Sequence, residues 1–223
     1  MPIFRSKNEH FFKQWSPEMA YVLGFFCADG CIFTNPRGSC YLAFYSTDRE
    51  ILEKIKRVMG VSHVIGTRSI RPGMKKVSYC LQIGSRGMYE DLRQLGLTEN
   101  KSCSIELPAV PEQYLPDFVR GYFDGDGNVT VSTYYRKDRE SHVGRTMLTG
   151  FTSGSRKFLQ RLRVLLTKVA GLGLGTLYFA SRGHRLCYSV RDSRKLYEFM
   201  YNNQASNSFL TRKQQKFLTY KSV

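Results

Sequence analysis

The sequence predicts an α+β fold built from two pseudo-symmetric units, each with the element order αββαββα. The main observation is an internal repeat, because YVLGFFCADG at 21–30 returns as FVRGYFDGDG at 118–127, 97 residues later, with five of ten positions identical. A weaker echo pairs FYSTDREIL at 44–52 with FTSGSRKFL at 151–159. Helical and strand patterns follow both copies in the same order. We therefore divide the chain into an N-terminal unit (1–97), a linker (98–112) and a C-terminal unit (113–223).

Caps, turns and periodicity predict the elements of the first unit. Ser16 and Pro17 are typical of a helix start, and Gly30 of a helix end. Residues 31–46 alternate as two strands around an Asn-Pro-Arg-Gly turn. Apolar residues recur at helical spacing over 48–59. The remaining elements expected are strands at 63–70 and 75–84 and a helix at 86–95.

The second unit repeats this order. Pro116 opens a helix that reaches Asp126. After it, the sequence patterns predict strands at 128–135 and 143–152, a helix at 155–169, strands at 174–182 and 185–191, and a helix at 192–202.

The two repeated helices have a small-residue face and end on a carboxylate. The small residues are Gly24 and Ala28 in the first copy and Gly121 and Gly125 in the second. Such faces let helix backbones approach closely, so we expect the two helices to pack with their ends side by side. Asp29 and Asp126 would then repel each other at the negative ends of two helix dipoles. A divalent cation removes both penalties, and oxygen ligands suit Mg²⁺ or Ca²⁺.

The charge balance indicates a polyanionic partner. Lys plus Arg number 34 against 18 Asp plus Glu, a formal net charge of +16, and no carboxylate occurs between Glu140 and Asp192. Nucleic acid is favoured over an anionic membrane, because neither a membrane span nor a basic amphipathic helix with a clean apolar face is evident. The six cysteines are scattered without a CxxC pair, which favours free thiols in a reducing intracellular compartment, either a prokaryotic cytoplasm or an organelle.

VLGFFCADG (22–30) and VRGYFDGDG (119–127) resemble the LAGLIDADG motif. From about Ser16 to Lys216 the chain is similar to the single-chain, two-motif LAGLIDADG homing endonucleases, which are often intron-encoded. The resemblance implies motif helices at the interface between two halves and saddle-shaped antiparallel sheets on DNA. It also implies that a monomer cuts both strands of a long asymmetric DNA target and leaves short 3′ overhangs.

The resemblance assigns roles by position. Asp29 and Asp126 match the catalytic acids that bind metal, with the carbonyls of Ala28 and Gly125 beside the metals; Cys27 departs from the motif at a position that is not a metal ligand. Basic residues near the active centres match Lys101 and Lys213, with Lys216 as the alternative to Lys213. Ser46 and Ser153 stand where members often place a water-positioning Gln. The implied cofactor is Mg²⁺, for which Mn²⁺ could substitute, whereas Ca²⁺ could bind without supporting cleavage.

Strand alternation predicts which side chains face DNA. Lys76, Ser78, Cys80 and Gln82 share one face of 75–83, and Arg185, Cys187, Ser189 and Arg191 share one face of 185–191. Tyr178 and Arg182 lie opposite Leu177 and Phe179. Further DNA contacts are expected from Arg37, Arg68, Arg71, Lys75, Arg136, Lys137, Arg139 and Arg145.

Two functions remain open. The first is a site-specific DNA endonuclease, favoured because both motif acids are present. The second is a catalytically idle relative that acts as an intron RNA maturase or a DNA-binding regulator. A basic RNA-binding structural protein does not explain the duplicated helix ends.

Overall fold

The computed structural model describes residues 5–68, 77–135, 143–180, 183–202 and 210–221. The first half comprises α1 (Pro17–Asp29), β1 (Gly30–Thr34), β2 (Cys40–Ser46), α2 (Arg49–Val58), β3 (Ile65–Arg68), β4 (Ser78–Gly84) and α3 (Arg86–Gln94). The second half comprises α4 (Leu115–Asp126), β5 (Gly127–Tyr135), β6 (Val143–Ser153), α5 (Arg156–Ala170), β7 (Thr176–Ala180), β8 (Gly183–Tyr188) and α6 (Val190–Tyr201). The predicted α+β class and the repeated αββαββα order are confirmed.

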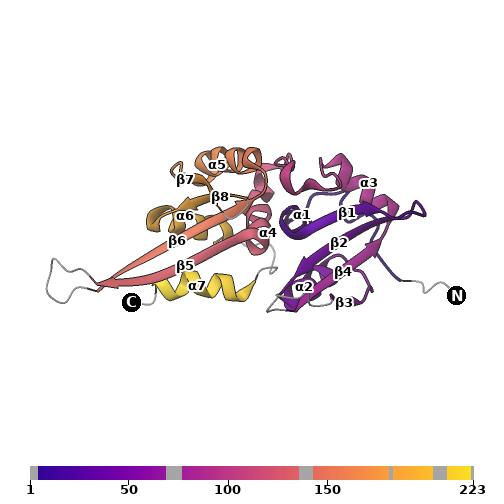
Figure 1. The fold of residues 1–223 in the computed structure, drawn as a ribbon, viewed down its shortest axis with the longest axis horizontal. Coiled ribbons are helices and arrows are strands. Elements are labelled where there is room, and N and C mark those ends of the chain that lie inside the picture. Colours follow the sequence, from indigo (N-terminus) through magenta and orange to yellow (C-terminus); the bar gives the residue numbers. More distant parts are fainter. Residues whose placement is uncertain (1–4, 69–76, 136–142, 181–182, 203–209, 222–223) are drawn as a thin grey trace.

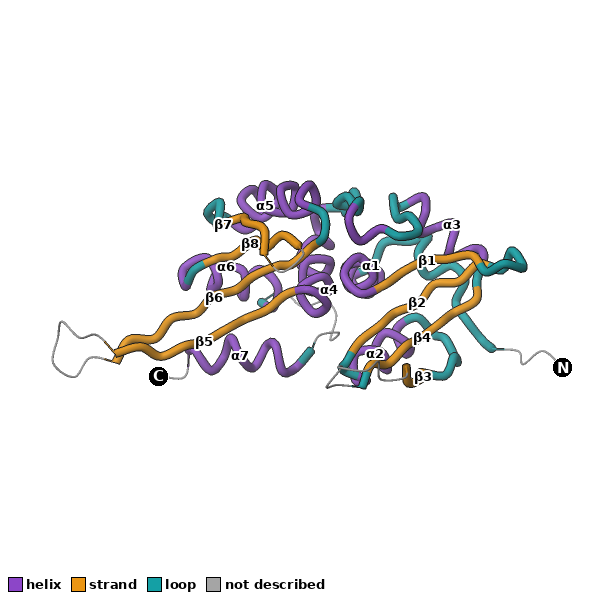
Figure 2. The backbone as a smooth tube through the Cα atoms, viewed as in Figure 1, coloured by secondary structure: helices purple, strands orange, loops and turns teal. Residues whose placement is uncertain are grey.

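Each half contains one four-stranded antiparallel sheet, and the two sheets have the same topology. Their strand orders are β1-β2-β4-β3 and β5-β6-β8-β7. Figure 1 shows α1 and α4 next to each other at the centre, with the sheets extending to opposite sides. In the backbone view of Figure 2, the β5–β6 hairpin reaches much further from the centre than β1–β2.

The two central helices touch backbone to backbone, as their small residues predict. A Cβ added to Gly24 would lie 2.0 Å from the carbonyl oxygen of Phe118, and one added to Gly121 would lie 2.0 Å from that of Tyr21. Tyr21 and Phe118 are equivalent in the repeat, so the contact is two-fold symmetric. Near the helix ends, a Cβ on Gly125 would lie 2.4 Å from the Cβ of Ala28. Only glycine permits this approach at the crossing.

The helix α1 is apolar all round because it is enclosed by both halves, whereas α4 also buries the ion pair of Arg120 with Asp117. Residues 19–27 of α1 are all buried. The start of α1 follows local rules, since Pro17 occupies the first turn and the Oγ of Ser16 accepts a hydrogen bond of 3.1 Å from the N–H of Met19. Aromatic side chains such as Phe26 and Phe44, whose ring centroids are 5.0 Å apart, tie α1 to its sheet.

Three elements were not predicted. Residues 98–112, expected as a linker, contain the 3-10 helix Lys101–Cys103 and begin a second one, Glu112–Tyr114. The helix α7 (Thr211–Lys221) follows the second unit and lies alongside β5 (Figure 1). Phe217 anchors α7, because it is buried and its ring centroid lies 5.6 Å from that of Phe123.

The prediction of a strand over 185–191 is wrong at its end. β8 stops at Tyr188, Ser189 is the N-cap of α6, and Arg191 lies within that helix. Serine is a preferred N-cap and Asp192 favours a first helical turn, so a helix begins after Ser189. The alternation of apolar residues continues to Val190 by coincidence, and this led to the wrong prediction. Within the described residues, no helix is long and apolar enough to cross a membrane.

Candidate active site and DNA interface

Asp29 and Asp126 are brought together at the touching ends of α1 and α4. A Cβ on Gly125 would lie 3.4 Å from the Oδ2 of Asp29, so the first carboxylate reaches the end of the second helix. Burial and, second, the negative charge of Asp29 raise the pKa of Asp126 from 3.8 to about 7. Burial also raises the pKa of Asp29. Two neighbouring carboxylates therefore resist being ionised together.

Two buried lysines cap the same helix ends. The Nζ of Lys101 donates a hydrogen bond of 2.9 Å to the carbonyl of Cys27. The Nζ of Lys213 donates bonds of 2.7 Å to the carbonyls of Phe123, Asp124 and Gly127, and one of 3.3 Å to that of Gly125. These bonds satisfy carbonyls that a helix C-terminus otherwise leaves unpaired. Lys216 is exposed, so Lys213 is the residue at the helix end.

The lysines act across the boundary between the halves. Of the two, Lys213 has the larger effect in lowering the pKa of Asp29, and Lys101 has the larger effect on the pKa of Asp126. Burial lowers the pKa of Lys213 itself to about 8. Of the two lysines, each carboxylate is therefore affected more by the one from across the boundary between the halves.

These residues fit a divalent cation. Paired, half-buried carboxylates are unfavourable as anions without a positive charge between them, and the carbonyls of Ala28 and Gly125 lie at the same helix ends. In the part of the chain that the structure describes, no group of three His, Cys, Asp or Glu residues could hold a metal. Two carboxylates with carbonyl, water and phosphate oxygens match the way Mg²⁺ is usually bound.

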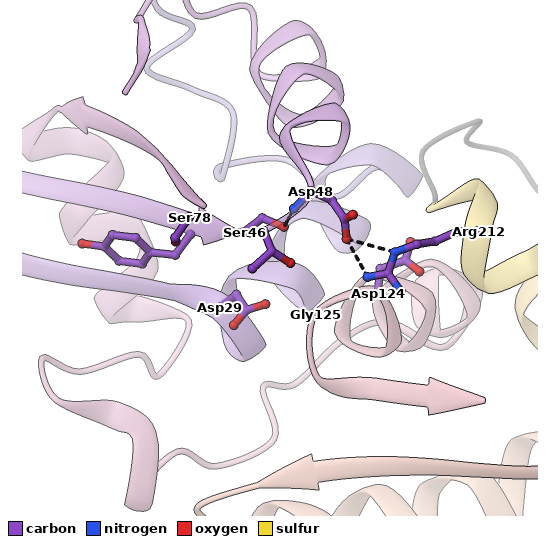
Figure 3. A pocket seen from close by; sticks show the side chains of 9 residues that line it. Asp29, Ser46, Asp48, Ser78, Asp124, Gly125 and Arg212 are labelled. Atoms are coloured by element: carbon purple, nitrogen blue, oxygen red, sulfur yellow. Dashed lines mark hydrogen bonds and ion pairs between the residues drawn. The ribbon is translucent and has the colours of Figure 1, made fainter. Parts of the chain in front are cut away.

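A cavity of about 200 Å³ opens beside Asp29 (Figure 3). Residues of both halves line it, among them Ser46, Asp48 and Ser78 from the first half and Asp124, Gly125 and Arg212 from the second. The guanidinium of Arg212 bridges the halves, because its Nη2 lies 2.5 Å from the Oδ2 of Asp48.

Ser46 and Ser153 occupy equivalent places at the ends of β2 and β6. The Oγ of Ser46 accepts a hydrogen bond of 3.0 Å from the N–H of Asp48, and the Oγ of Ser153 accepts one of 3.1 Å from the N–H of Ser155. Both hydroxyls thus stabilise a strand-to-helix turn. Ser153 is buried and its side chain also hydrogen-bonds with Tyr122, and water positioning by both serines stays a prediction.

Asp124 has a structural role that was not predicted from the sequence. Its Oδ2 accepts hydrogen bonds of 2.7 Å from the hydroxyl of Tyr21 and of 2.7 Å from the N–H of Leu210, just before α7. Asp124 is buried, and its Oδ1 has no hydrogen-bond partner among the described residues. The carboxylate therefore ties the start of α7, and with it Lys213, to both central helices. The sequence analysis did not predict α7, and without this helix the role of Asp124 could not be predicted.

The open face of the first sheet carries the predicted alternation. Ser78, Cys80 and Gln82 lie on it, while Leu81 and Ile83 are buried on the other side. The guanidinium of Arg68 lies 4.7 Å from the ring centroid of Tyr45, which pairs with Cys80 across β2 and β4. Arg37 is exposed in the turn between β1 and β2.

The open face of the second sheet is larger than predicted. Tyr178 and Arg185 are paired across β7 and β8, and the hydroxyl of Tyr178 lies 3.7 Å from the Sγ of Cys187. Sequence reasoning missed the polar residues of the long hairpin, which lie on the same face: Asn128, Thr130, Ser132, Tyr134 and Thr146. Their alternation with Val129 and Val131 was a signal that could have found them.

Several predicted DNA contacts do not lie on an open strand face. Ser189 caps α6 and Arg191 lies in it. Arg145 lies on the covered face two residues before the buried Met147, where it donates a hydrogen bond of 2.7 Å to the carbonyl of Thr219 in α7. The remaining candidates lie outside the described residues: Arg71, Lys75, Lys76, Arg136, Lys137, Arg139 and Arg182.

Two family models match this chain, one in each half. A LAGLIDADG-like domain matches residues 16–95, and a LAGLIDADG endonuclease domain matches residues 119–223. Among curated proteins, the uncharacterised protein MJ0398 of Methanocaldococcus jannaschii is 31% identical over 124 residues, which are 52% of this chain and 40% of that protein. The chain therefore aligns with well under half of that relative's length.

Solved structures of meganucleases share the fold. The meganuclease I-AabMI bound to uncleaved DNA has a TM-score of 0.60 at 15% identity, over 93% of this chain and 90% of that one. I-LtrWI bound to target DNA has a TM-score of 0.60 at 10% identity, over 96% and 89%. I-SmaMI, bound to an uncleaved DNA target in the presence of calcium ions, has a TM-score of 0.59 at 14% identity, over 93% and 90%. Because the two motif helices pack through their small residues and a family model matches each half, the chain belongs to the LAGLIDADG endonuclease family and has the fold of its two-domain homing endonucleases.

Proposed function

We propose that this chain is a site-specific homing endonuclease that hydrolyses one phosphodiester in each DNA strand with divalent metals and leaves short 3′ overhangs. The observation that carries the proposal is the pair Asp29 and Asp126 at the touching ends of α1 and α4. Burial and mutual repulsion disfavour two ionised carboxylates there, and the pKa of each stays raised in spite of Lys101 and Lys213. A metal-dependent reaction at the touching helix ends explains the presence of both carboxylates.

The chain's residues would divide the chemistry as follows. Asp29, Asp126 and the carbonyls of Ala28 and Gly125 would hold Mg²⁺ or Mn²⁺, and Ca²⁺ could bind without supporting cleavage. Bound metal supplies an activated water and stabilises the departing 3′-oxygen during in-line attack. Lys101 and Lys213 add fixed positive charge beside the phosphate as negative charge develops on it. The hydroxyls of Ser46 and Ser153 would orient the attacking water.

DNA would lie across the two open sheet faces. Polar and aromatic side chains on a two-stranded ribbon can contact base edges in the major groove. The two faces differ in length and composition, since β5 has nine residues and β1 has five. A monomer with unequal halves would therefore recognise a long asymmetric target. The six cysteines are all free, which supports a reducing compartment. A prokaryotic cytoplasm and an organelle are both compatible with the proposal.

Selection from a randomised duplex library tests the proposal. Wild-type protein with Mg²⁺ should cut a subset of duplexes on both strands, whereas Asp29→Asn and Asp126→Asn should each lose cleavage of at least one strand. Glu90→Gln is a matched control, because Glu90 is an exposed carboxylate paired with Arg86 on α3. Failure of wild type to cut any duplex, or wild-type cutting by both Asn variants, refutes the proposal.

A binding measurement distinguishes the second candidate, a catalytically idle maturase or DNA-binding regulator. Such a relative would bind a selected nucleic acid in Ca²⁺ but leave it intact in Mg²⁺. The endonuclease predicts binding in Ca²⁺ and cleavage in Mg²⁺ on the same duplex.

A further inference from the structure

We propose that Arg212 binds the scissile phosphate at the Asp29 centre only, so that the two DNA strands are cut at unequal rates. This inference rests on the proposed endonuclease function. It concerns a residue that neither the motifs nor the predicted sites include.

Arg212 is placed to reach a phosphate beside Asp29. It is the second residue of α7, next to Lys213, and it crosses from the second half to the cavity that Asp29, Ser46 and Ser78 line from the first (Figure 3). At about 200 Å³ this cavity has room for several water molecules of about 30 Å³ each, and so for the oxygens of a phosphodiester.

The present partner of Arg212 is a carboxylate that a phosphate can replace. The Nε and Nη2 of Arg212 lie 3.1 and 2.5 Å from the Oδ2 of Asp48. A planar guanidinium binds carboxylate and phosphate oxygens with the same two-pronged geometry. The pair is open to solvent, with the side chain of Arg212 53% exposed and that of Asp48 29% exposed. Exposed ion pairs are weak, so little free energy is lost when a DNA phosphate replaces Asp48 as the partner of Arg212.

Among the described residues, the second centre has no arginine at the place equivalent to Arg212. The residue before Lys101 is Asn100, a neutral side chain held in the left-handed backbone conformation at φ 57°. The place of Asp48, two residues after the strand-end serine, is taken by Ser155. The ion pair of Arg212 with Asp48 therefore lies on the Asp29 side, whereas Lys157 and Arg161 at the start of α5 are paired with Glu106. The strand cut at the Asp29 centre should gain additional stabilisation of its transition state.

Strand-resolved cleavage tests this assignment. A duplex selected with wild type carries a different fluorophore on each strand, and single-turnover rates are measured for both strands with Mg²⁺. We expect Arg212→Gln to slow one strand about a hundredfold and the other less than about threefold, with accumulation of one nicked product. Arg212→Lys should recover part of the lost rate, because lysine keeps the positive charge but lacks the two-pronged geometry of the guanidinium.

Two further variants separate phosphate binding from a purely structural ion pair. Arg86→Gln is the matched control, since Arg86 is an exposed arginine paired with Glu90 at the far end of β4. Asp48→Asn breaks the ion pair but leaves the guanidinium, so its loss on the affected strand should be much smaller than that of Arg212→Gln. The melting temperature and the affinity for DNA in Ca²⁺ are measured for every variant, to separate effects on folding and binding from effects on the bond-breaking step.

Each alternative outcome overturns the inference. If Arg212→Gln slows both strands equally, or neither, Arg212 is not a ligand of one scissile phosphate. If Asp48→Asn slows cleavage of the same strand to the same extent as Arg212→Gln, Arg212 acts only through the ion pair. If wild type cuts no duplex at all, the proposed function itself fails, which is a distinct result.

Discussion

Replacing Gly24 by alanine should damage both stability and the active site, because the central helices touch backbone to backbone. The new Cβ would lie 2.0 Å from the carbonyl oxygen of Phe118 and 2.9 Å from the N of Tyr122. Ordinary contacts to a Cβ begin near 3.4 Å, so α1 and α4 must separate by more than about 1 Å. Unlike a side chain, the backbone of α4 cannot rotate away.

The size of the effect follows from two opposing contributions. Alanine in place of glycine favours a helix by about 1 kcal/mol. Overpacking of a tight core typically costs about 1–3 kcal/mol, and a clash with main-chain atoms lies at the upper end or beyond. We expect a net loss of about 2 kcal/mol or more in the free energy of unfolding. For a chain of this length that corresponds to a fall in Tm of about 4–8 °C.

The assay is thermal unfolding followed by circular dichroism, with Gly87→Ala as the control. Gly87 lies in α3, and a Cβ there would meet nothing closer than the Oγ of Ser85 at 4.0 Å. This control should be unchanged or more stable by up to about 1 kcal/mol. At temperatures well below its Tm, where it is still folded, Gly24→Ala should also cleave DNA more slowly than wild type, since Asp29 moves away from Asp126. If Gly24→Ala unfolds within about 0.5 kcal/mol of wild type, the close helix contact is refuted.

Three further predictions address the site. Lys213→Met should lower stability by about 1–3 kcal/mol, because the carbonyls of Phe123, Asp124 and Gly127 lose a buried donor, and should abolish cleavage of one strand; equal stability in urea unfolding would contradict this. The folded pKa of Asp126 is about 7 against an ordinary value of 3.8, so the folded chain retains a proton that the unfolded chain has lost. The contribution of Asp126 to the stability of the metal-free protein should therefore fall as pH rises from about 4 to 7. Unfolding of wild type and Asp126→Asn across this range should show the difference, and Mg²⁺ should reduce it. Asp124→Cys, which copies the residue of the first repeat, should increase hydrogen exchange in α7 because Leu210 and Tyr21 lose their shared acceptor, and unchanged exchange would exclude that anchoring role.

Local sequence rules predicted most of the secondary structure. The cap at Ser16, the turn before Cys40 and the repeated glycines each depend on a few neighbouring residues, and the structure has the expected elements there. The rules failed at Ser189, where strand alternation and a helix cap coincide in the same residues. They also missed α7, whose apolar content is low and whose position depends on Phe217 packing against Phe123.

The sequence by itself determined the duplication, the carboxylate at the end of each repeated helix and the small residues that let the helices meet. These features are written in residue types and spacings along the chain, and the close contact of Gly24 and Gly121 with the opposite helix confirms the packing they predict. Only the tertiary structure decided which charges surround the carboxylates. Lys213 rather than Lys216 is buried at the helix end, Arg145 is turned onto α7, and Arg212 reaches Asp48. The physical reason is that these contacts join residues 74–164 positions apart, whose meeting depends on how two sheets and a late helix pack rather than on any local pattern.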